Sequence, residues 1–348
     1  MGGIEAWARR NVRHYFARGV KLRPVLPLLL VAAVLPSRSQ PIFRVPVRIV
    51  EVPAAVTGGD GKFVRGLAPS DFALFDNDRP QQFDLDEAGQ AFSLAIAIQT
   101  NAAVRAWLPE VSRSASPVEA LVLGKQGEAA VLTFGDEVNV VQVTTSDAAH
   151  LDKAFRGLKA SGGKSRSIDA VLKATQLLGE ATAGRRRVLL LIAQAGNAGS
   201  KANLRDVMNE VERRNITVYC LTMPRVGRDL LGSVRVSGLS SQGSRDTGFV
   251  VSADLTKLVP EIYRGSKTAA GEDAVTLLTR YTSGTMIPFR SRKDLDAAIS
   301  SIGEELHTGY VLTYTPSGSG AGYHRIGVTV ARDGASVRAR PGYYVAEP

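Results

Sequence analysis

The tripeptide Gly163-Lys164-Ser165 has the composition of the end of a phosphate-binding loop. In such a loop the backbone N–H groups hold phosphates, and the motif requires a further glycine five positions before the glycine-lysine pair. That position is Leu158, and the nearest glycine, Gly157, is displaced by one residue. The preceding segment also has helical periodicity, whereas a phosphate-binding loop follows a strand. A nucleotide-binding enzyme is therefore only a minor alternative.

Other residues able to do chemistry are scattered along the chain. The four histidines are His14, His150, His307 and His324. None belongs to a His-Glu-x-x-His zinc motif, and no serine lies in a Gly-x-Ser-x-Gly nucleophile motif. The single cysteine, Cys220, lies in an apolar run and is expected to be a buried small hydrophobe. We predict that the protein is not an enzyme and needs no cofactor.

The net charge of +10 over 348 residues would suit a nucleic-acid partner, but its distribution does not. Residues 1–39 hold seven lysines and arginines and one glutamate, so they account for six of the ten net positive charges. The rest of the chain is only weakly basic, and no stretch interleaves basic and aromatic residues as a base-stacking platform would. We therefore expect no nucleic-acid partner.

The N-terminal residues have the pattern of a secretory signal peptide. A basic segment is followed by an uncharged apolar run at 25–35, and Ser37 and Ser39 supply the small residues of a cleavage site after Ser39. The run is short for a membrane span, so we expect no stable span once the signal is cleaved. The sequence predicts an exported protein, periplasmic or extracellular, with anchoring by an uncleaved signal as the alternative.

The mature chain changes hydrophobic period twice. Residues 41–90 and 308–345 alternate apolar and polar residues, which predicts half-buried strands. Residues 92–307 alternate short apolar runs with helical spacing, which is typical of βα units around a mostly parallel sheet. Because a few strands alone are marginally stable, we expect the two flanks to pair into one β-sandwich that contains the α/β domain as an insertion.

Individual elements follow from the same periodicities. We predict the strands of the α/β domain at 93–98, 129–134, 187–193, 216–221 and 285–289. We predict helices around 151–158, 168–175, 204–211 and 295–302, the third of them capped by Asn203. In the first flank, strands at 72–75 and 81–85 enclose a turn at 76–78. The glycine- and serine-rich residues 224–273 are expected to form a long excursion.

Several short motifs in both flanks occur together in one known family. They are residues 43–47 (FRVPV), 60–67 (DGKFVRGL), 71–81 (DFALFDNDRPQ), 309–316 (GYVLTYTP), 323–326 (YHRI) and 337–344 (VRARPGYY). Their combination over most of the mature chain resembles the acidobacterial VWFA-related family. The resemblance implies a von Willebrand factor type A-like, three-layer domain with a Rossmann-like sheet between the two flanks.

Such domains usually bind Mg²⁺ or Ca²⁺ through loops at the carboxyl end of the sheet, and here the expected ligands are replaced. The family's first loop reads Asp-x-Ser-x-Ser, and the resemblance places Gln99, Asn101 and Ala103 at those three positions. The second loop usually ends in threonine after two glycines, and Ser165 or Ser167 stands there.

The third loop of the family offers another aspartate, and Gln194 takes its place. Hard divalent cations need oxygen ligands that usually include carboxylates, whereas these loops offer neutral amides and hydroxyls. Lys164 and Arg166 add positive charge at the same rim. We therefore predict a degenerate metal site, in which Gln99 and Gln194 hold the loops together by hydrogen bonds.

Ligands of open α/β sheets bind at the carboxyl ends of the strands, which makes these loops the candidate partner-binding face. It comprises Gln99, Thr100, Asn101, Lys164, Ser165, Arg166 and Gln194. We predict a metal-independent, adhesion-type module for a protein partner, which its two basic residues suggest is acidic. The alternative is a structural component of the cell envelope with an inactive face.

Overall fold

The computed structural model describes residues 48–87, 91–119, 127–194, 196–224, 259–263, 274–318 and 320–345, all of which belong to one compact unit. The predicted signal peptide at 1–39, residues 41–47 of the predicted first β flank and most of the excursion at 224–273 lie outside these residues. Three sheets are present in the described part of the chain, two of four strands and one of six.

The six-stranded sheet has the order β10-β9-β8-β5-β6-β7. All neighbouring strands are parallel except β6 and β7, which are antiparallel and show two register shifts. Every residue of β5 is buried, because helices cover both faces of the sheet and a continuous apolar run is needed there. The strands are β5 (Phe92–Gln99), β6 (Glu128–Phe134), β7 (Val138–Thr145), β8 (Arg186–Ala193), β9 (Ile216–Thr222) and β10 (Met286–Pro288).

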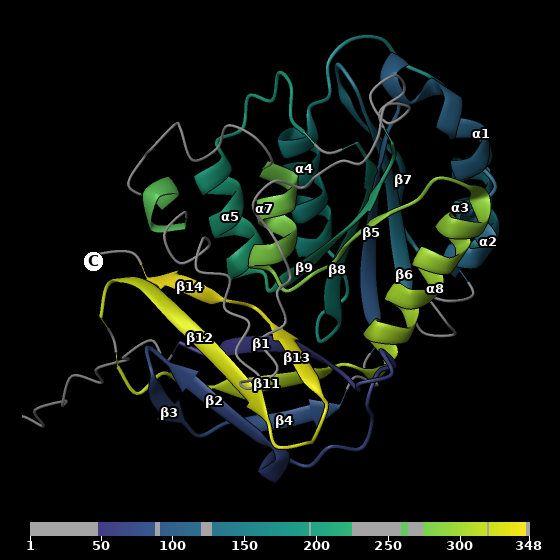
Figure 1. The fold of residues 1–348 in the computed structure, drawn as a ribbon. Coiled ribbons are helices and arrows are strands. Elements are labelled where there is room, and N and C mark those ends of the chain that lie inside the picture. The colour runs from purple at the N-terminus through teal and green to yellow at the C-terminus, as the bar shows by residue number, and fades with distance from the viewer. Residues whose placement is uncertain are drawn as a thin grey trace, which may run out of the picture. The chain divides into compact units, whose positions relative to one another are not determined.

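Helices lie on both faces of this sheet (Figure 1). One apolar cluster joins the sheet to α4 (Ser167–Gly179), α5 (Leu204–Arg213) and α7 (Ala274–Tyr281). A second cluster joins the other face to α3 (Ala148–Arg156), α8 (Arg292–Thr308) and the short elements η2 (Ala102–Trp107), α1 (Leu108–Val111) and α2 (Ala115–Val118). Side-chain N-caps fix three helix starts: Asp147 for α3, Asn203 for α5 as predicted, and Ser291 for α8.

The two flanks of the chain pair into the predicted sandwich. Its sheets have the orders β13-β1-β11-β4 and β14-β12-β2-β3, and their inner faces share one apolar core. From the first flank come β1 (Val50–Thr57), β2 (Phe72–Asp76), β3 (Arg79–Gln81) and β4 (Asp84–Glu87), with the 3-10 turn η1 (Pro69–Asp71) before β2. From the second come β11 (Tyr310–Tyr314), β12 (Gly322–Val330), β13 (Ser336–Ala339) and β14 (Gly342–Val345).

The predicted fold class is confirmed by this topology, whereas the exact domain boundaries stay a prediction. Two details differ. The single strand predicted at 81–85 is wrong, because the chain breaks after Gln81 and β3 and β4 join different sheets. The sequence reading also missed β7, whose bulges interrupt strict alternation, and α7.

Buried polar groups connect the elements. The Tyr219 hydroxyl on β9 donates to the Glu305 carboxylate on α8 over 2.6 Å, and the Arg338 guanidinium on β13 lies 2.5 Å from the same carboxylate. This contact joins the sandwich to the α/β part. Burial, followed by the negative charge of Glu305, holds the pKa of Tyr219 well above its usual range.

A second buried carboxylate lies at the start of β6. Glu128 accepts hydrogen bonds from the Ser93 hydroxyl at 2.5 Å and from both the backbone and the hydroxyl of Thr182, at 3.0 and 2.9 Å. Burial alone would raise the pKa of Glu128, but these hydrogen bonds and the nearby Arg185 guanidinium outweigh it and lower the pKa. The charged form of Glu128 therefore stabilises the junction of β5, β6 and the loop before β8.

Candidate functional site

The side chain of Gln99 is buried at the carboxyl end of β5 and links two loops. Its Nε2 donates to Oδ1 of Asn101 over 2.9 Å, and its Oε1 accepts the backbone N–H of Gln194 over 2.8 Å. Because β5 and β8 are parallel neighbours, their ends meet at one edge of the sheet and this single amide can bridge them. Both the nitrogen and the oxygen of the amide are engaged with protein groups.

The loop after β5 is also tied to its other neighbours. Asn101 donates to the carbonyl of Gly163 over 3.3 Å, which joins the first loop to the second. The Thr100 N–H donates to the Phe134 carbonyl at the end of β6 over 2.9 Å, and the Thr100 carbonyl accepts the Ser161 N–H over 2.7 Å. Thr100, a predicted face residue, is buried, so it positions the loops and offers little surface to a partner.

The predicted contact between Gln99 and Gln194 exists, but it uses the backbone of Gln194. The side-chain amide of Gln194 turns the other way and donates to the Pro224 carbonyl over 3.1 Å and to the Ala103 carbonyl over 3.4 Å. Ala103 therefore takes part through its backbone alone. Gln194 connects the ends of β5 and β8 to the residues that follow β9.

The start of α4 is capped by a hydroxyl from the third loop. Ser200 Oγ accepts the N–H groups of Ile168 and Asp169 at 3.1 and 3.3 Å, and the Asp169 carboxylate accepts the N–H groups of Lys201 and Ala202. The N–H groups of Ile168 and Asp169 lie at the N-terminus of α4, where such groups could otherwise hold a phosphate. Here they are bonded to the protein itself.

The basic residues of the second loop lie at the edge of this network. Lys164 is exposed, and its aliphatic stem lies against Gly199 of the third loop. Its backbone N–H donates to Asp136 over 2.8 Å. Arg166 is partly buried, and its Nε has no hydrogen-bond partner among the described residues. The same holds for the hydroxyl of Ser165, which does not join the network around Gln99.

A divalent cation does not fit these residues. Gln99 Oε1 and Asn101 Oδ1, the oxygens that would face it, already accept hydrogen bonds from Gln194 and Gln99. Two carboxylates bond to these loops, and both are engaged: Asp136 accepts the Lys164 N–H, and Asp169 accepts the N–H groups of Lys201 and Ala202. A hard cation would have to displace these bonds and would gain only neutral ligands in their place. The arrangement is a hydrogen-bonded clasp of three loops.

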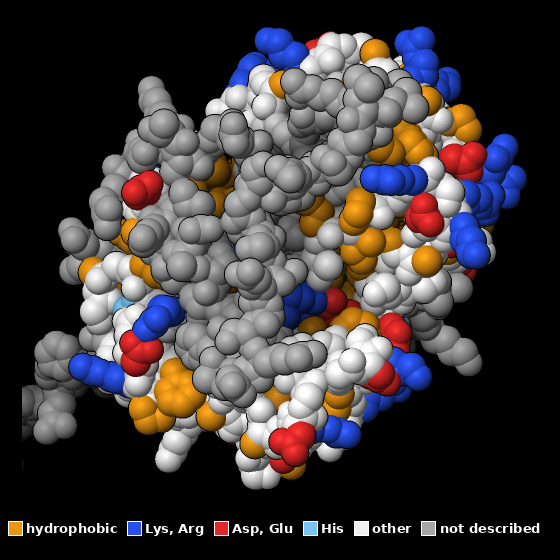
Figure 2. Space-filling view, viewed as in Figure 1, with side chains coloured by type: hydrophobic (Ala, Val, Ile, Leu, Met, Phe, Trp, Pro, Cys, Tyr) orange, Lys and Arg blue, Asp and Glu red, His pale blue; other side chains and the backbone are white. Residues whose placement is uncertain are grey.

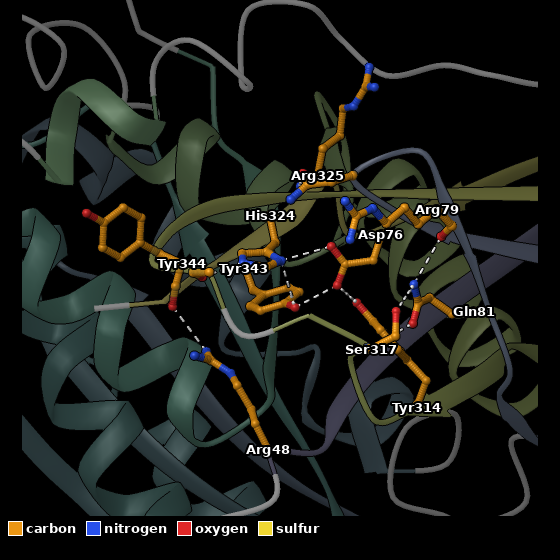
Figure 3. A network of polar contacts seen from close by, with 12 residues as sticks. Arg48, Asp76, Arg79, Gln81, Tyr314, Ser317, His324, Arg325, Tyr343 and Tyr344 are labelled. Atoms are coloured by element: carbon orange, nitrogen blue, oxygen red, sulfur yellow. Dashed lines mark hydrogen bonds and ion pairs between the residues drawn. The ribbon is translucent and has the colours of Figure 1, made fainter. Parts of the chain in front are cut away.

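A second polar cluster, which the sequence reading did not find, lies inside the sandwich (Figure 3). The Asp76 carboxylate on β2 accepts the hydroxyls of Tyr314 and Tyr343 at 2.9 and 2.7 Å, and its other oxygen lies 2.9 Å from Nδ1 of His324. All four side chains are buried. The other ring nitrogen, Nε2, lies 2.7 Å from the Gly320 carbonyl.

This cluster joins the two layers of the sandwich, since Tyr314 belongs to the sheet of β11 and the other three residues to the sheet of β12. Burial raises the pKa of both tyrosines, and the neighbouring Asp76 raises it further, so the hydroxyls stay protonated as donors. A sequence signal was present, because all four residues lie in the motif segments 71–81, 309–316, 323–326 and 337–344. Their pairing could not be deduced from it.

Comparisons with known proteins give low similarities. No family model matches the chain, and no curated protein matches it. Among solved structures it is similar to the VWA domain of SpRpn10 at 12% identity (TM-score 0.34, over 39% of this chain and 77% of that domain). It is similar to BatB from Bacteroides thetaiotaomicron at 13% identity (TM-score 0.41, 62% and 98%) and to a von Willebrand factor type A protein from Catenulispora acidiphila at 9% identity (TM-score 0.43, 85% and 75%).

None of the helices in the described ranges is long and apolar enough to span a membrane.

Proposed function

We propose that the protein is an exported, non-enzymatic binding module whose partner contacts the loops at the carboxyl end of the six-stranded sheet without a metal ion. The observation that carries this proposal is the clasp around Gln99. Its amide holds the loops after β5 and β8 in one geometry through two hydrogen bonds at 2.8 and 2.9 Å. Loops that are already ordered lose less conformational freedom when a partner binds.

The charge of the rim favours an acidic partner. Lys164 is exposed at the second loop, and Arg166 lies two residues further on. On the face viewed in Figure 2, basic side chains gather along the upper edge, where the strands of the six-stranded sheet end in Figure 1. Complementary charge accelerates encounter and excludes wrong partners more than it adds affinity. Export is supported by the basic and apolar pattern of residues 1–39.

The first test concerns the metal. The thermal midpoint of the purified full chain is measured with and without millimolar Mg²⁺, Mn²⁺ or Ca²⁺, because a ligand that binds the folded state raises this midpoint with concentration. We expect no shift. A shift that disappears in Gln99→Ala would refute metal independence.

The second test concerns the face. The wild type and the double variant Lys164→Glu/Arg166→Glu are immobilised and exposed to envelope protein extract, and the retained proteins are quantified. Lys62→Glu/Arg65→Glu is the matched control, since it reverses two exposed charges on a turn of the sandwich. We expect an acidic protein retained by the wild type and the control and lost from the rim variant. Equal retention by all three would contradict the proposal and favour the structural alternative.

A further inference from the structure

The outer edge of the six-stranded sheet is unusual at β7. This strand is last in the sheet order and pairs only with β6 among the described strands, so the backbone groups of its other edge have no strand partner. Natural proteins usually protect such edges with lysine, proline or a very short strand. The opposite edge follows this rule, because β10 has three residues and ends in Pro288.

The strand β7 has bulges toward β6, which also restrict pairing, but it has no protecting lysine or proline. Residues 138–146 (VNVVQVTTS) contain no charge and no proline, and the strand is eight residues long. Three large apolar side chains are exposed in the described part of the chain, and two of them lie here: Val141 with 43% and Val143 with 62% of its surface exposed. The third, Ile49 with 61%, lies before β1. An uncharged edge with exposed valines is suited to pairing with another strand.

A hollow adjoins this edge and carries negative charge. A cavity of about 380 Å³ is lined by Asn139 and Val141 of β7, by the carboxylates of Asp136 and Glu137 in the preceding turn, and by Lys159. Both carboxylates are exposed, and neither forms an ion pair within the described ranges. The apolar edge therefore leads directly into a cavity with excess negative charge.

From this combination we propose that β7 binds an extended segment of a partner protein, which adds a strand to the sheet and places a lysine or arginine beside Asp136 and Glu137. Backbone pairing along the edge would give the affinity, and the valines and carboxylates would select alternating apolar and basic side chains. The strand edge itself, Val138–Thr145, lies outside the clasp, but the cavity borders it, because Thr100 and Ser161 also line the cavity and Asp136 accepts the Lys164 N–H. The peptide test below uses the strand edge and Glu137, which take no part in the clasp, so it is independent of the function proposed for the loops.

Two observations argue against a second copy of this chain as the occupant. Antiparallel self-pairing centred on Gln142 would place Val141 opposite Val143 of the other copy, but it would also place Glu137 opposite the other copy's Asp147. The two carboxylates would repel each other at both ends of the paired strands. In addition, the two register shifts between β6 and β7 twist the strand, so continuous pairing is limited to a short stretch. A short basic peptide has no carboxylate to repel Glu137, and it needs only a short stretch of strand pairing.

The probe is a fluorescent peptide of sequence Lys-Val-Thr-Val-Lys-Val-Thr-Val, compared with the same peptide carrying glutamate in place of lysine. Binding to the full chain is followed by fluorescence anisotropy, and the oligomeric state by light scattering. Val143→Lys introduces a charge on the edge, and Ile49→Lys makes the same change at an equally exposed site elsewhere. Glu137→Gln removes one charge from the cavity.

We expect the basic peptide to bind and the acidic one not to bind. Val143→Lys should weaken binding by about tenfold or more and Glu137→Gln by about fivefold, while Ile49→Lys stays within about twofold of the wild type. Equal binding by Val143→Lys and the wild type, equal binding of both peptides, or no binding at about 1 mM peptide would each overturn the proposal. A dimer abolished by Val143→Lys would assign the edge to a second copy instead.

Discussion

Replacing Asp76 by alanine removes the acceptor on which the polar cluster of the sandwich depends. The carboxylate accepts two tyrosine hydroxyls, at 2.9 and 2.7 Å, and lies 2.9 Å from the ring of His324. In the variant these three groups stay buried, and water cannot replace the lost acceptor without entering the core. A buried donor left unsatisfied costs about 1–3 kcal/mol, although neighbouring losses do not add fully.

From these values we expect Asp76→Ala to lower the free energy of unfolding by about 4 kcal/mol, the size typical of removing one partner from a buried polar pair. Asp76→Asn keeps the shape and one oxygen acceptor, so it should cost about 2 kcal/mol. The control is Asp78→Ala, two residues away. The Asp78 side chain is 71% exposed and pairs with Arg325 at the surface, so its loss should cost less than about 1 kcal/mol.

Urea unfolding of the full chain measures these differences, provided that the slope with denaturant is the same in all variants. Amide hydrogen exchange assigns the loss to a region, because β2, β11, β12 and β14 should lose protection while β5 and β8 keep theirs. If Asp76→Ala unfolds within about 1 kcal/mol of Asp78→Ala, the cluster does not stabilise the sandwich and the reasoning fails.

Three further predictions concern single sites. Gly163→Ala should lower the free energy of unfolding in urea by about 2 kcal/mol, since Gly163 has φ +70° and an added Cβ would clash with the Asp136 carboxylate. The control Gly61→Ala, with φ +77° and open space, should lower it by about 1 kcal/mol, and equal losses would contradict the clash. Glu128→Gln should lower the free energy of unfolding most above pH 4.5, the ordinary pKa of a glutamate, because the pKa of Glu128 is lowered in the folded protein. The difference in stability between variant and wild type should shrink as the pH falls below that value, and a difference independent of pH between about 3 and 7 would refute this. Asn203→Ala removes the cap of α5 and should lower stability by about 1 kcal/mol, with exchange increased in the first turn of α5 if the cap is responsible.

The parts of the fold that could be predicted are those in which local sequence and tertiary environment agree. The strands predicted at 93–98 and 187–193 contain continuous apolar runs, residues 94–98 and 188–193, because both faces of the sheet are covered. The strands β5 and β8 match the predicted ranges within one residue at each end. The strand β7 escaped prediction because it is an edge strand with two bulges and three of its eight residues exposed. The edge position and the exposed side chains of β7 weaken its hydrophobic pattern, and they also leave the strand accessible to a partner.

The candidate site shows a similar division. The resemblance identified Gln99, Asn101 and Gln194 as neighbours, and parallel strand ends bring them together. Which atoms bond could not be predicted, since the Gln194 backbone competes with its side chain for Gln99. Asp76 and His324 are 248 residues apart in sequence, so no local pattern could indicate their contact.

Because the two flanks pair with each other, the β-sandwich can be completed only late in synthesis of the chain. Both neighbours of β1 are strands from the last forty residues, and the neighbour of β4, β11, begins at Tyr310. When the ribosome has made the first three hundred residues, none of the strands that flank β1 and β4 in the described sheets has been synthesised, whereas β2 and β3 can already form their hairpin. Contacts so distant along the chain form slowly. Premature termination just before residue 310 would therefore leave the early strands of the sandwich exposed to wrong partners, even with the whole six-stranded sheet complete.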